Sequence, residues 1–309
     1  MSHISDNPIY LVSVGAATAT GESYSGYSGS GTGPDFPGNA EHPHLLDFRG
    51  ERYFVAMAPY IVPECQGTSR FQCTAFNYAL ADCCEHLSLP ASTPFILCLP
   101  EARPMFGAEN KQQRSDSQLA EDCPGLRIPE QNVFMQGHAG AFPALTSVRH
   151  YLREHEFCLL AGVDSYIDSM TLNWLDSLSF VSHNQNAWGF TPGEAAACVL
   201  LCHEQVLEKY RLRSLGCLTA FSDALEPVHH TEGVCTGQGL SEALRQTLQH
   251  RPTEQKINRT ICDLNGQTHR SDEYGFTLTR LSEHFEHPEN FITPLTAGEM
   301  WGQLAAFCT

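Results

Sequence analysis

The stretch over residues 157–202 constrains the fold of this chain most, because it holds two dense apolar runs separated by polar sequence. Residues 157–163 read Phe-Cys-Leu-Leu-Ala-Gly-Val, and residues 199–202 read Val-Leu-Leu-Cys. Short apolar runs bounded by turn residues are typical of strands that are buried on both faces. A glycine-rich turn over residues 189–197, which contains the single acid Glu194, leads into the second run. We therefore expect two buried strands, with one acidic side chain in the turn before the second.

Strand-like and helix-like segments alternate along the rest of the chain. The order strand, turn, helix, strand over residues 132–163 predicts a βαβ unit with parallel strands, and a second such series is expected over residues 215–285. Residues 21–38 are rich in Gly, Ser, Pro and Tyr and are expected to form a mobile loop. No Lys-Ser/Thr pair follows that loop, so it lacks the pattern of a phosphate-binding loop. The expected strands cover residues 9–17, 52–58, 94–99, 132–135, 157–163, 199–202, 215–221 and 259–262, and the expected helices cover residues 71–87, 141–154, 239–250 and 271–285, with a polar surface segment over residues 109–122.

Composition excludes several classes of partner. The 309 residues are 42% hydrophobic, which is enough for one large α/β domain or two fused units. The formal charge of −17 repels phosphate backbones, so no nucleic-acid partner is expected. The same charge disfavours coenzyme A and acidic carrier proteins unless a local basic patch exists. No apolar run approaches the ~18 residues of a membrane span, so a soluble, cytoplasmic protein without a membrane contact is expected.

The 13 cysteines are expected to be reduced thiols that pack as small hydrophobic residues, because no Cys-x-x-Cys pair occurs. No metal site is expected: the adjacent His229 and His230 can point apart, so they form a poor ligand pair. Cys235, flanked by polar residues and glycines, is the cysteine whose surroundings most resemble those of a nucleophile.

The passage over residues 157–202 also resembles a known sequence pattern. Its segments GVDSY (162–166), GFTPGEAAA (189–197) and VLLC (199–202) resemble the "GGVDSY … GFxPGEAAA … LL" passage of the β-ketoacyl synthases (3-oxoacyl-ACP synthases) in the thiolase superfamily. The resemblance implies a thiolase-like α/β fold, a duplicated, layered α-β-α-β-α sandwich with two mixed five-stranded-type sheets. It also implies one unit over residues 1–309 with two pseudo-repeated halves, approximately 1–200 and 210–309. No bound cofactor is implied, and the substrate would be a coenzyme A or phosphopantetheine thioester.

The resemblance places the catalytic nucleophile, a cysteine in the family, at His138. In the family this residue lies in the turn between a strand and a buried helix, where the helix N-terminus stabilises a thiolate and an oxyanion. A histidine there could act as a general base or hydrogen-bond partner, but it could not form the thioester that condensation needs. A helix-start histidine without chemistry is the structural alternative.

The two family histidines fall at Asn265 and Glu299. Asn265 occupies the first position of the family's "H-G-T-x-T … D" turn, and Asp272 matches the later acid. Asn265 could still polarise a carbonyl, although Asn-Gly is also an ordinary tight turn. Glu299 takes the position of the second histidine in residues 298–304, the nearest match to the family's "G-H-x-x-G-A-A" helix start, and the alternative is a helix-capping acid. The family's terminal "GFGG" strand is expected to be missing after Thr309.

Further family positions fall on supporting residues. Asp223, His229 and His230 resemble a loop near the family's pocket mouth, and Glu194 matches an acid that is mainly structural in the family.

Two functions follow as hypotheses. The first is a non-condensing, acyl-binding or partner subunit of fatty-acid or polyketide-type metabolism, a homodimer or a heterodimer with a related synthase that could meet an acyl carrier protein. The second is an active acyltransferase, thioester hydrolase or decarboxylase that uses His138 as base, Asn265 as donor, and Glu299 or Asp272 to orient them.

Overall fold

A six-stranded mixed sheet forms the centre of the computed structural model, which describes residues 8–23, 39–61, 68–101, 128–228, 233–250 and 255–292. The strand order is β5-β4-β6-β7-β1-β8. Strand β4 is parallel to β5 and β6, whereas the β6–β7, β7–β1 and β1–β8 pairs are antiparallel. The bounds of these strands are β1 Ile9–Thr18, β4 Phe95–Cys98, β5 Val133–Phe134, β6 Phe157–Ser165, β7 Glu194–Cys202 and β8 Gly216–Leu218.

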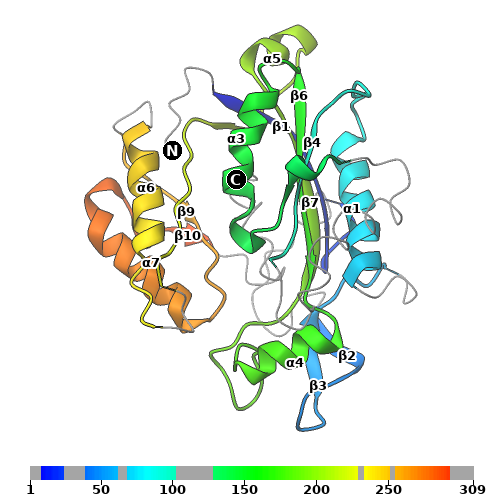
Figure 1. Cartoon of the computed structure of the whole chain (residues 1–309), viewed down its shortest axis with the longest axis vertical. Coiled ribbons are helices and arrows are strands. Elements are labelled where there is room, and N and C mark those ends of the chain that lie inside the picture. Colours follow the sequence, from blue (N-terminus) through cyan, green and yellow to red (C-terminus); the bar gives the residue numbers. More distant parts are fainter. Residues whose placement is uncertain are drawn as a thin grey trace.

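Helices cover both faces of this sheet. Helix α1 (Thr68–Cys84) packs on one face and α3 (Ala141–Tyr151) on the other, as Figure 1 shows. Every residue of β6 and β7 is buried for this reason. Successive side chains alternate between the two core clusters, with Leu159 in the cluster on the α1 face and Leu160 in the cluster on the α3 face.

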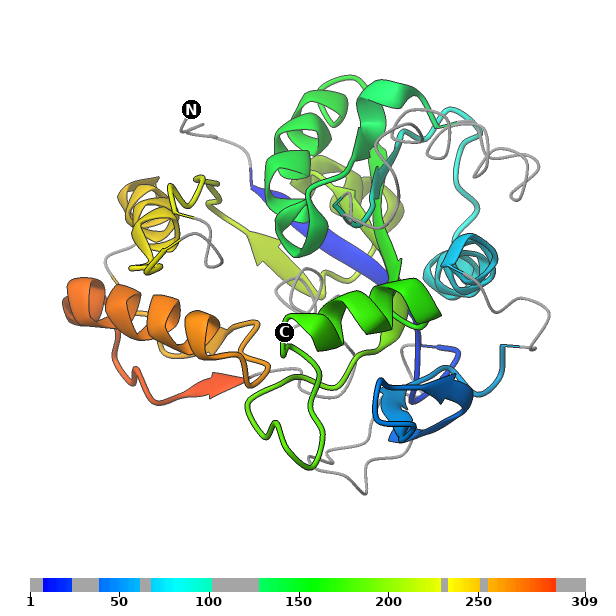
Figure 2. The same ribbon diagram turned by 60° about the horizontal axis from the view of Figure 1, so that its bottom comes forward.

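A hairpin and a helix form a smaller lobe at one end of the sheet. Figure 2 brings forward the hairpin of β2 (Asn39–Leu46) and β3 (Arg52–Ala56) with α4 (Ser169–Ser177) beside it. Asp168 caps α4 by accepting a hydrogen bond from the Thr171 amide at 2.9 Å. Tyr53, Val55, Leu172 and Phe190 belong to the small core between these elements.

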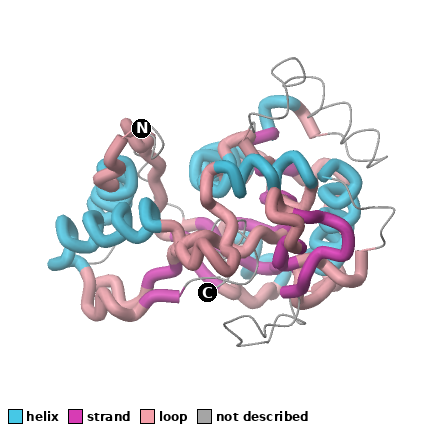
Figure 3. The backbone as a smooth tube through the Cα atoms, turned by 90° about the horizontal axis from the view of Figure 1, so that it is seen from below, coloured by secondary structure: helices cyan, strands magenta, loops and turns pink. Residues whose placement is uncertain are grey.

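The C-terminal elements form a group on the far side of α3, as Figures 1 and 3 show. Helices α6 and α7 pack on each other, and β9 pairs in parallel with β10. The bounds of this group are α6 Gln238–His250, β9 Thr260–Ile261, α7 Thr268–Leu281 and β10 Phe291–Ile292. Helix α5 (Glu204–Tyr210) is not part of it and lies beside β6 at the top of Figure 1. No helix of the described residues is both long and apolar enough to cross a membrane.

Most of the predicted elements are confirmed, but several details are wrong. Strand β7 begins at Glu194, so residues 195–197 belong to the strand and not to the turn. The second βαβ series does not form, because β8 pairs antiparallel with β1 while β9 belongs to a separate sheet. Strands β2 and β10 and helices α4 and α5 were not expected from the sequence. In place of two five-stranded sheets, the described residues form one sheet of six strands and two of two strands.

Two predicted surface segments lie largely or wholly outside the described residues. These are the loop over residues 21–38, of which residues 21–23 are described, and the segment over residues 109–122.

Candidate functional site

His138 lies in the turn that connects β5 to α3. The turn is a single 3₁₀ turn over Gly137–Ala139, and α3 begins at Ala141. Gly137 has φ of +57°, a conformation that glycine adopts without the steric cost of a Cβ. The imidazole is 42% exposed, so it remains open to solvent. The predicted location of His138 at a helix start is therefore confirmed.

Two side chains from the region between β9 and the first turn of α7 lie beside His138, and two more are hydrogen-bonded in series behind them. Asp263 and Asn265 lie in the loop after β9, Gln267 is the N-cap residue of α7, and Arg270 lies in its first turn. Arg270 Nη1 lies 3.1 Å from His138 Nε2 and forms an ion pair with Asp263. Asp263 Oδ2 lies 3.7 Å from the same imidazole nitrogen. Of these four residues, only Asn265 was predicted from the sequence.

The protonation of the imidazole follows from its neighbour. A guanidinium carries only donors, so in the Arg270–His138 hydrogen bond Nε2 must accept. The neutral imidazole then carries its proton on Nδ1. In this arrangement the Nε2 lone pair, the one that a general base would use, points to a cation.

Asn265 forms part of a tight turn. Its Oδ1 accepts from the Gln267 amide at 3.1 Å, and its Nδ2 donates to Gln267 Oε1 at 3.0 Å. Gly266 has φ of +106°, and a Cβ there would lie 3.0 Å from the Gly189 carbonyl oxygen. The same Gln267 oxygen accepts from Arg270 Nε at 3.0 Å, which links Asn265 to His138 through two intermediate side chains. The tight-turn interpretation of Asn265-Gly266 is thus correct.

Opposing effects set the charge of Asp263. Burial alone would raise the pKa of Asp263, but the Arg270 guanidinium outweighs it and holds that pKa below its usual value. Asp263 is therefore a carboxylate that compensates the charge of Arg270, whose side chain is only 8% exposed. Arg270 donates to both His138 and Asp263, and we call these three residues the His138 cluster.

The other sequence-predicted residues lie away from this cluster or outside the described chain. Asp272 is exposed on α7, and Asp223 is exposed before α6. The carboxylate beside His138 belongs to Asp263, for which the sequence predicted no role. His229, His230 and Glu299 lie outside the described residues.

Glu194 is a buried structural link. It accepts hydrogen bonds from the Ala58 amide at 2.9 Å and from Ser165 Oγ at 3.0 Å. These bonds connect the start of β7 to the end of β6 and to the segment after β3. This geometry agrees with the structural role expected for that acid.

Burial disfavours the thiolate form of two cysteines, Cys98 beside the start of α3 and Cys235 before α6. Cys98, at the end of β4, has its Cβ 3.7 Å from the Cβ position of Gly140, and burial raises the pKa of Cys98 to about 12. Burial also raises the pKa of Cys235, which is 8% exposed. A nucleophile needs a thiolate, so the surroundings of Cys235 do not favour the nucleophilic role considered for it.

Replacing Arg270 by methionine should lower the free energy of unfolding by about 2 kcal/mol, because His138, Asp263 and Gln267 each lose a donor. The loss stays below that of a fully buried pair because Asp263 is 41% exposed. Urea unfolding measures it, and Arg259→Met, at an exposed arginine before β9, serves as the control. Equal effects of the two substitutions would contradict the assignment of Arg270 as the centre of the cluster.

Comparison with known proteins identifies the fold. No protein-family model and no curated protein sequence matches the chain. Solved structures do match: a chain from a type II polyketide-synthase complex of an acyl-carrier protein with its ketosynthase superposes with a TM-score of 0.71 at 10% identity, covering 98% of this chain and 86% of that one. The chain has the ketosynthase fold. The thiolase-like fold class predicted from the sequence is thereby confirmed.

Two further matches show the range of proteins that share the ketosynthase fold. A ketosynthase in complex with its chain length factor, from Xenorhabdus doucetiae, gives a TM-score of 0.60 at 15% identity and covers 100% of this chain and 85% of that one. The ketosynthase from module 6 of the Bacillus subtilis 168 bacillaene synthase gives 0.66 at 14% identity. The match covers 91% of this chain but only 55% of that ketosynthase, so this chain spans about half of that protein's length.

Proposed function

We propose that this chain is a non-condensing subunit of ketosynthase fold, which pairs with a condensing ketosynthase in fatty-acid or polyketide-type acyl-thioester metabolism. The observation that carries the proposal is His138. It takes the position at which the sequence resemblance expects the cysteine, and its Nε2 is hydrogen-bonded to Arg270. Condensation needs a thiolate that accepts an acyl group, and burial raises the pKa of Cys98, whose Cβ lies 3.7 Å from the Cβ position of Gly140.

The partner proposed is a related ketosynthase. Among solved structures of this fold, some are ketosynthases in complex with a chain length factor. A heterodimer of this kind needs no complete catalytic set in both subunits, which fits a His138 cluster without a thiolate. A homodimer and contact with an acyl carrier protein belong to the same proposal. Mixing the purified chain with a condensing ketosynthase, followed by light scattering after size exclusion, tests the pairing directly.

Purified protein should not condense acyl thioesters. Incubated with malonyl and acyl thioesters on coenzyme A or on a carrier protein, it should form 3-oxoacyl product at least about 10⁴-fold more slowly than a condensing ketosynthase assayed in parallel. Mass spectrometry of the products measures this. Condensation that exceeds this limit and disappears in His138→Ala would overturn the proposal.

The second candidate function is thioester hydrolysis or decarboxylation with His138 as base. The exposure of the imidazole and the nearby Asp263 carboxylate favour it, because substrate could reach the ring. The Arg270–Nε2 hydrogen bond opposes it, since the base would have to release that donor first. Release of carbon dioxide or of free acid in the same assay, lost in His138→Ala and increased in Arg270→Met, would establish this function in place of the first.

A further inference from the structure

A second cluster of reactive groups lies on the C-terminal side of the molecule, separate from His138. It consists of Glu226, Cys235 and Glu273, and we call it the Glu226 cluster. One ligand atom from each side chain lies within 4.8 Å of the ligand atoms of the other two. The three residues come from three segments: the chain before α6, the loop that enters α6, and the second turn of α7. A thiol and two carboxylates at this separation could share one cation.

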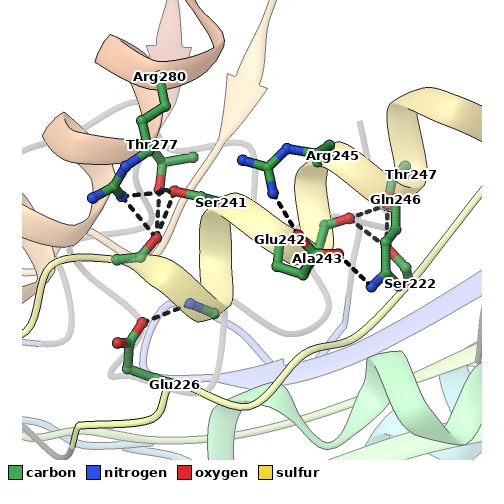
Figure 4. A network of polar contacts seen from close by, with 12 residues as sticks. Ser222, Glu226, Ser241, Glu242, Ala243, Arg245, Gln246, Thr247, Thr277 and Arg280 are labelled. Atoms are coloured by element: carbon green, nitrogen blue, oxygen red, sulfur yellow. Dashed lines mark hydrogen bonds and ion pairs between the residues drawn. The ribbon is translucent and has the colours of Figure 1, made fainter.

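One carboxylate oxygen of Glu226 accepts a hydrogen bond, and the other has no partner among the described residues. Its Oε2 accepts a hydrogen bond from the Gly239 amide at 2.8 Å, at the N-terminal end of α6 (Figure 4). Its Oε1 is buried and has no hydrogen-bond partner among the described residues. A buried carboxylate oxygen without a donor is costly, because it has lost its water without a replacement. A bound cation would supply the missing partner.

Cys235 is the most buried residue of the cluster. The residue is 8% exposed, and the Gly237 amide donates a hydrogen bond to its sulfur. An amide donor to sulfur is compatible with ligation, since it stabilises the thiolate without occupying every lone pair. The thiol therefore has a buried, fixed position facing two carboxylates.

Two glycines make the close approach of the three segments possible. A Cβ at Gly239 would lie 2.7 Å from the Glu226 amide nitrogen, and a Cβ at Gly237 would lie 2.6 Å from the Glu273 carbonyl oxygen. Gly237 also has φ of +64°. The ligand spacing therefore rests on the backbone packing of these segments, and side-chain rotamers alone do not determine it.

The two carboxylates of the cluster repel each other, because their ligand atoms lie within 4.8 Å of one another. A divalent cation between the ligands would relieve this repulsion.

We propose that Glu226, Cys235 and Glu273 form a binding site for a divalent transition-metal ion of the zinc class. One sulfur and two carboxylate ligands suit Zn²⁺ and Co²⁺, whereas Mg²⁺ and Ca²⁺ prefer oxygen ligands alone. Three protein ligands leave a fourth position for water or a substrate atom. The ion would join the loop before α6 to α7, and the site is independent of the His138 proposal.

Calorimetric titration of the full chain with Zn²⁺, after treatment with a chelator, tests the site. We expect one high-affinity Zn²⁺ per chain and no comparable binding of Mg²⁺. Cys235→Ser should weaken Zn²⁺ binding by at least about 10-fold, and Glu273→Gln by a similar factor. The matched control is Cys262→Ser, at a half-buried cysteine near β9 that lies outside the cluster, and it should bind as the wild type does.

Co²⁺ gives a second readout that depends on the ligand itself. Bound Co²⁺ should produce a sulfur-to-cobalt charge-transfer band that Cys262→Ser retains and Cys235→Ser loses. Thermal unfolding of the metal-free variants checks that each still folds. Equal Zn²⁺ affinities of Cys235→Ser and Cys262→Ser, or a band that persists in folded Cys235→Ser, would overturn the proposal.

Discussion

Replacing Gly15 by alanine should lower the free energy of unfolding by about 4 kcal/mol, the largest loss that we expect from a single methyl group in this protein. Gly15 lies in β1, where α1 crosses the sheet. A Cβ at this position would lie 2.0 Å from the Ala79 carbonyl oxygen and 2.4 Å from the Cys83 amide nitrogen. Both are backbone atoms of α1, so no side-chain rotation relieves the clash.

Helix α1 cannot move away from β1 without losing other bonds. Ser13 Oγ donates to the Cys83 carbonyl oxygen at 2.6 Å, and the Ala16 amide donates to Asp82 Oδ2 at 3.0 Å. These bonds flank Gly15 on both sides. A shift of α1 large enough to admit a methyl group would lengthen both bonds and open the core beneath the helix.

Gly216→Ala is the matched control. Gly216 also lies in a strand of the central sheet, and a Cβ there meets no atom within 4 Å. Urea unfolding under reducing conditions should show a change below about 1 kcal/mol for this variant. Similar stabilities of Gly15→Ala and Gly216→Ala would show that the backbone of α1 does not pack directly against Gly15.

The second large effect concerns Glu194 and pH. Burial raises the pKa of Glu194 to about 7 from the usual 4.5 of a solvated glutamate, although the bonds from Ala58 and Ser165 act in the opposite direction. Between these two values the folded protein holds a proton that the unfolded chain has released. Stability from this group is therefore greatest at low pH and falls as pH rises from about 4.5 to about 7.

As pH rises from about 5 to about 8, the ionisation of Glu194 alone should lower the free energy of unfolding by about 3 kcal/mol. Glu194→Gln should remove this loss, because an amide does not ionise and still offers an oxygen to the Ala58 amide. The difference in stability between Glu194→Gln and the wild type should therefore shift by about 3 kcal/mol in favour of the variant across this range. Urea unfolding at several pH values measures it.

Glu154→Gln, at an exposed glutamate after α3, controls for the loss of one negative charge. Its stability relative to the wild type should stay nearly constant with pH. If the difference in stability between Glu194→Gln and the wild type also stayed constant with pH, Glu194 would be hydrated and ionised in the folded protein, contrary to its burial.

Local features of the fold were predictable from the sequence, because they depend on neighbouring residues. The apolar runs of β6 and β7 indicate directly that these strands are buried. The helical periodicity of α1 and α3 indicates that one face of each helix packs against the sheet. Strand β2 was missed because its residues are mostly exposed and it includes Pro43. Helix α4 was missed because its signals are a single capping aspartate and a short apolar face.

The candidate site was only half predictable. Resemblance to the ketosynthase pattern led to His138 and Asn265, both of which lie in the turns expected for them. Asp263 carries no sequence signal of its own because it lies in a loop, and the one signal of Arg270 is a cation in the first turn of a helix, where the helix dipole favours an anion. Only the docking of α7 beside the β5–α3 turn shows that Arg270 binds His138.

By itself, the sequence determined that buried strands alternate with helices, and its resemblance to the ketosynthase pattern led to the turn that holds His138, because burial and motif are encoded in adjacent positions. The tertiary structure alone decided which distant side chains meet. Arg270 reaches His138 across 132 positions of the chain, and Glu226, Cys235 and Glu273 converge from three segments. Such meetings depend on how helices pack against one another, and no spacing pattern along the chain records that packing.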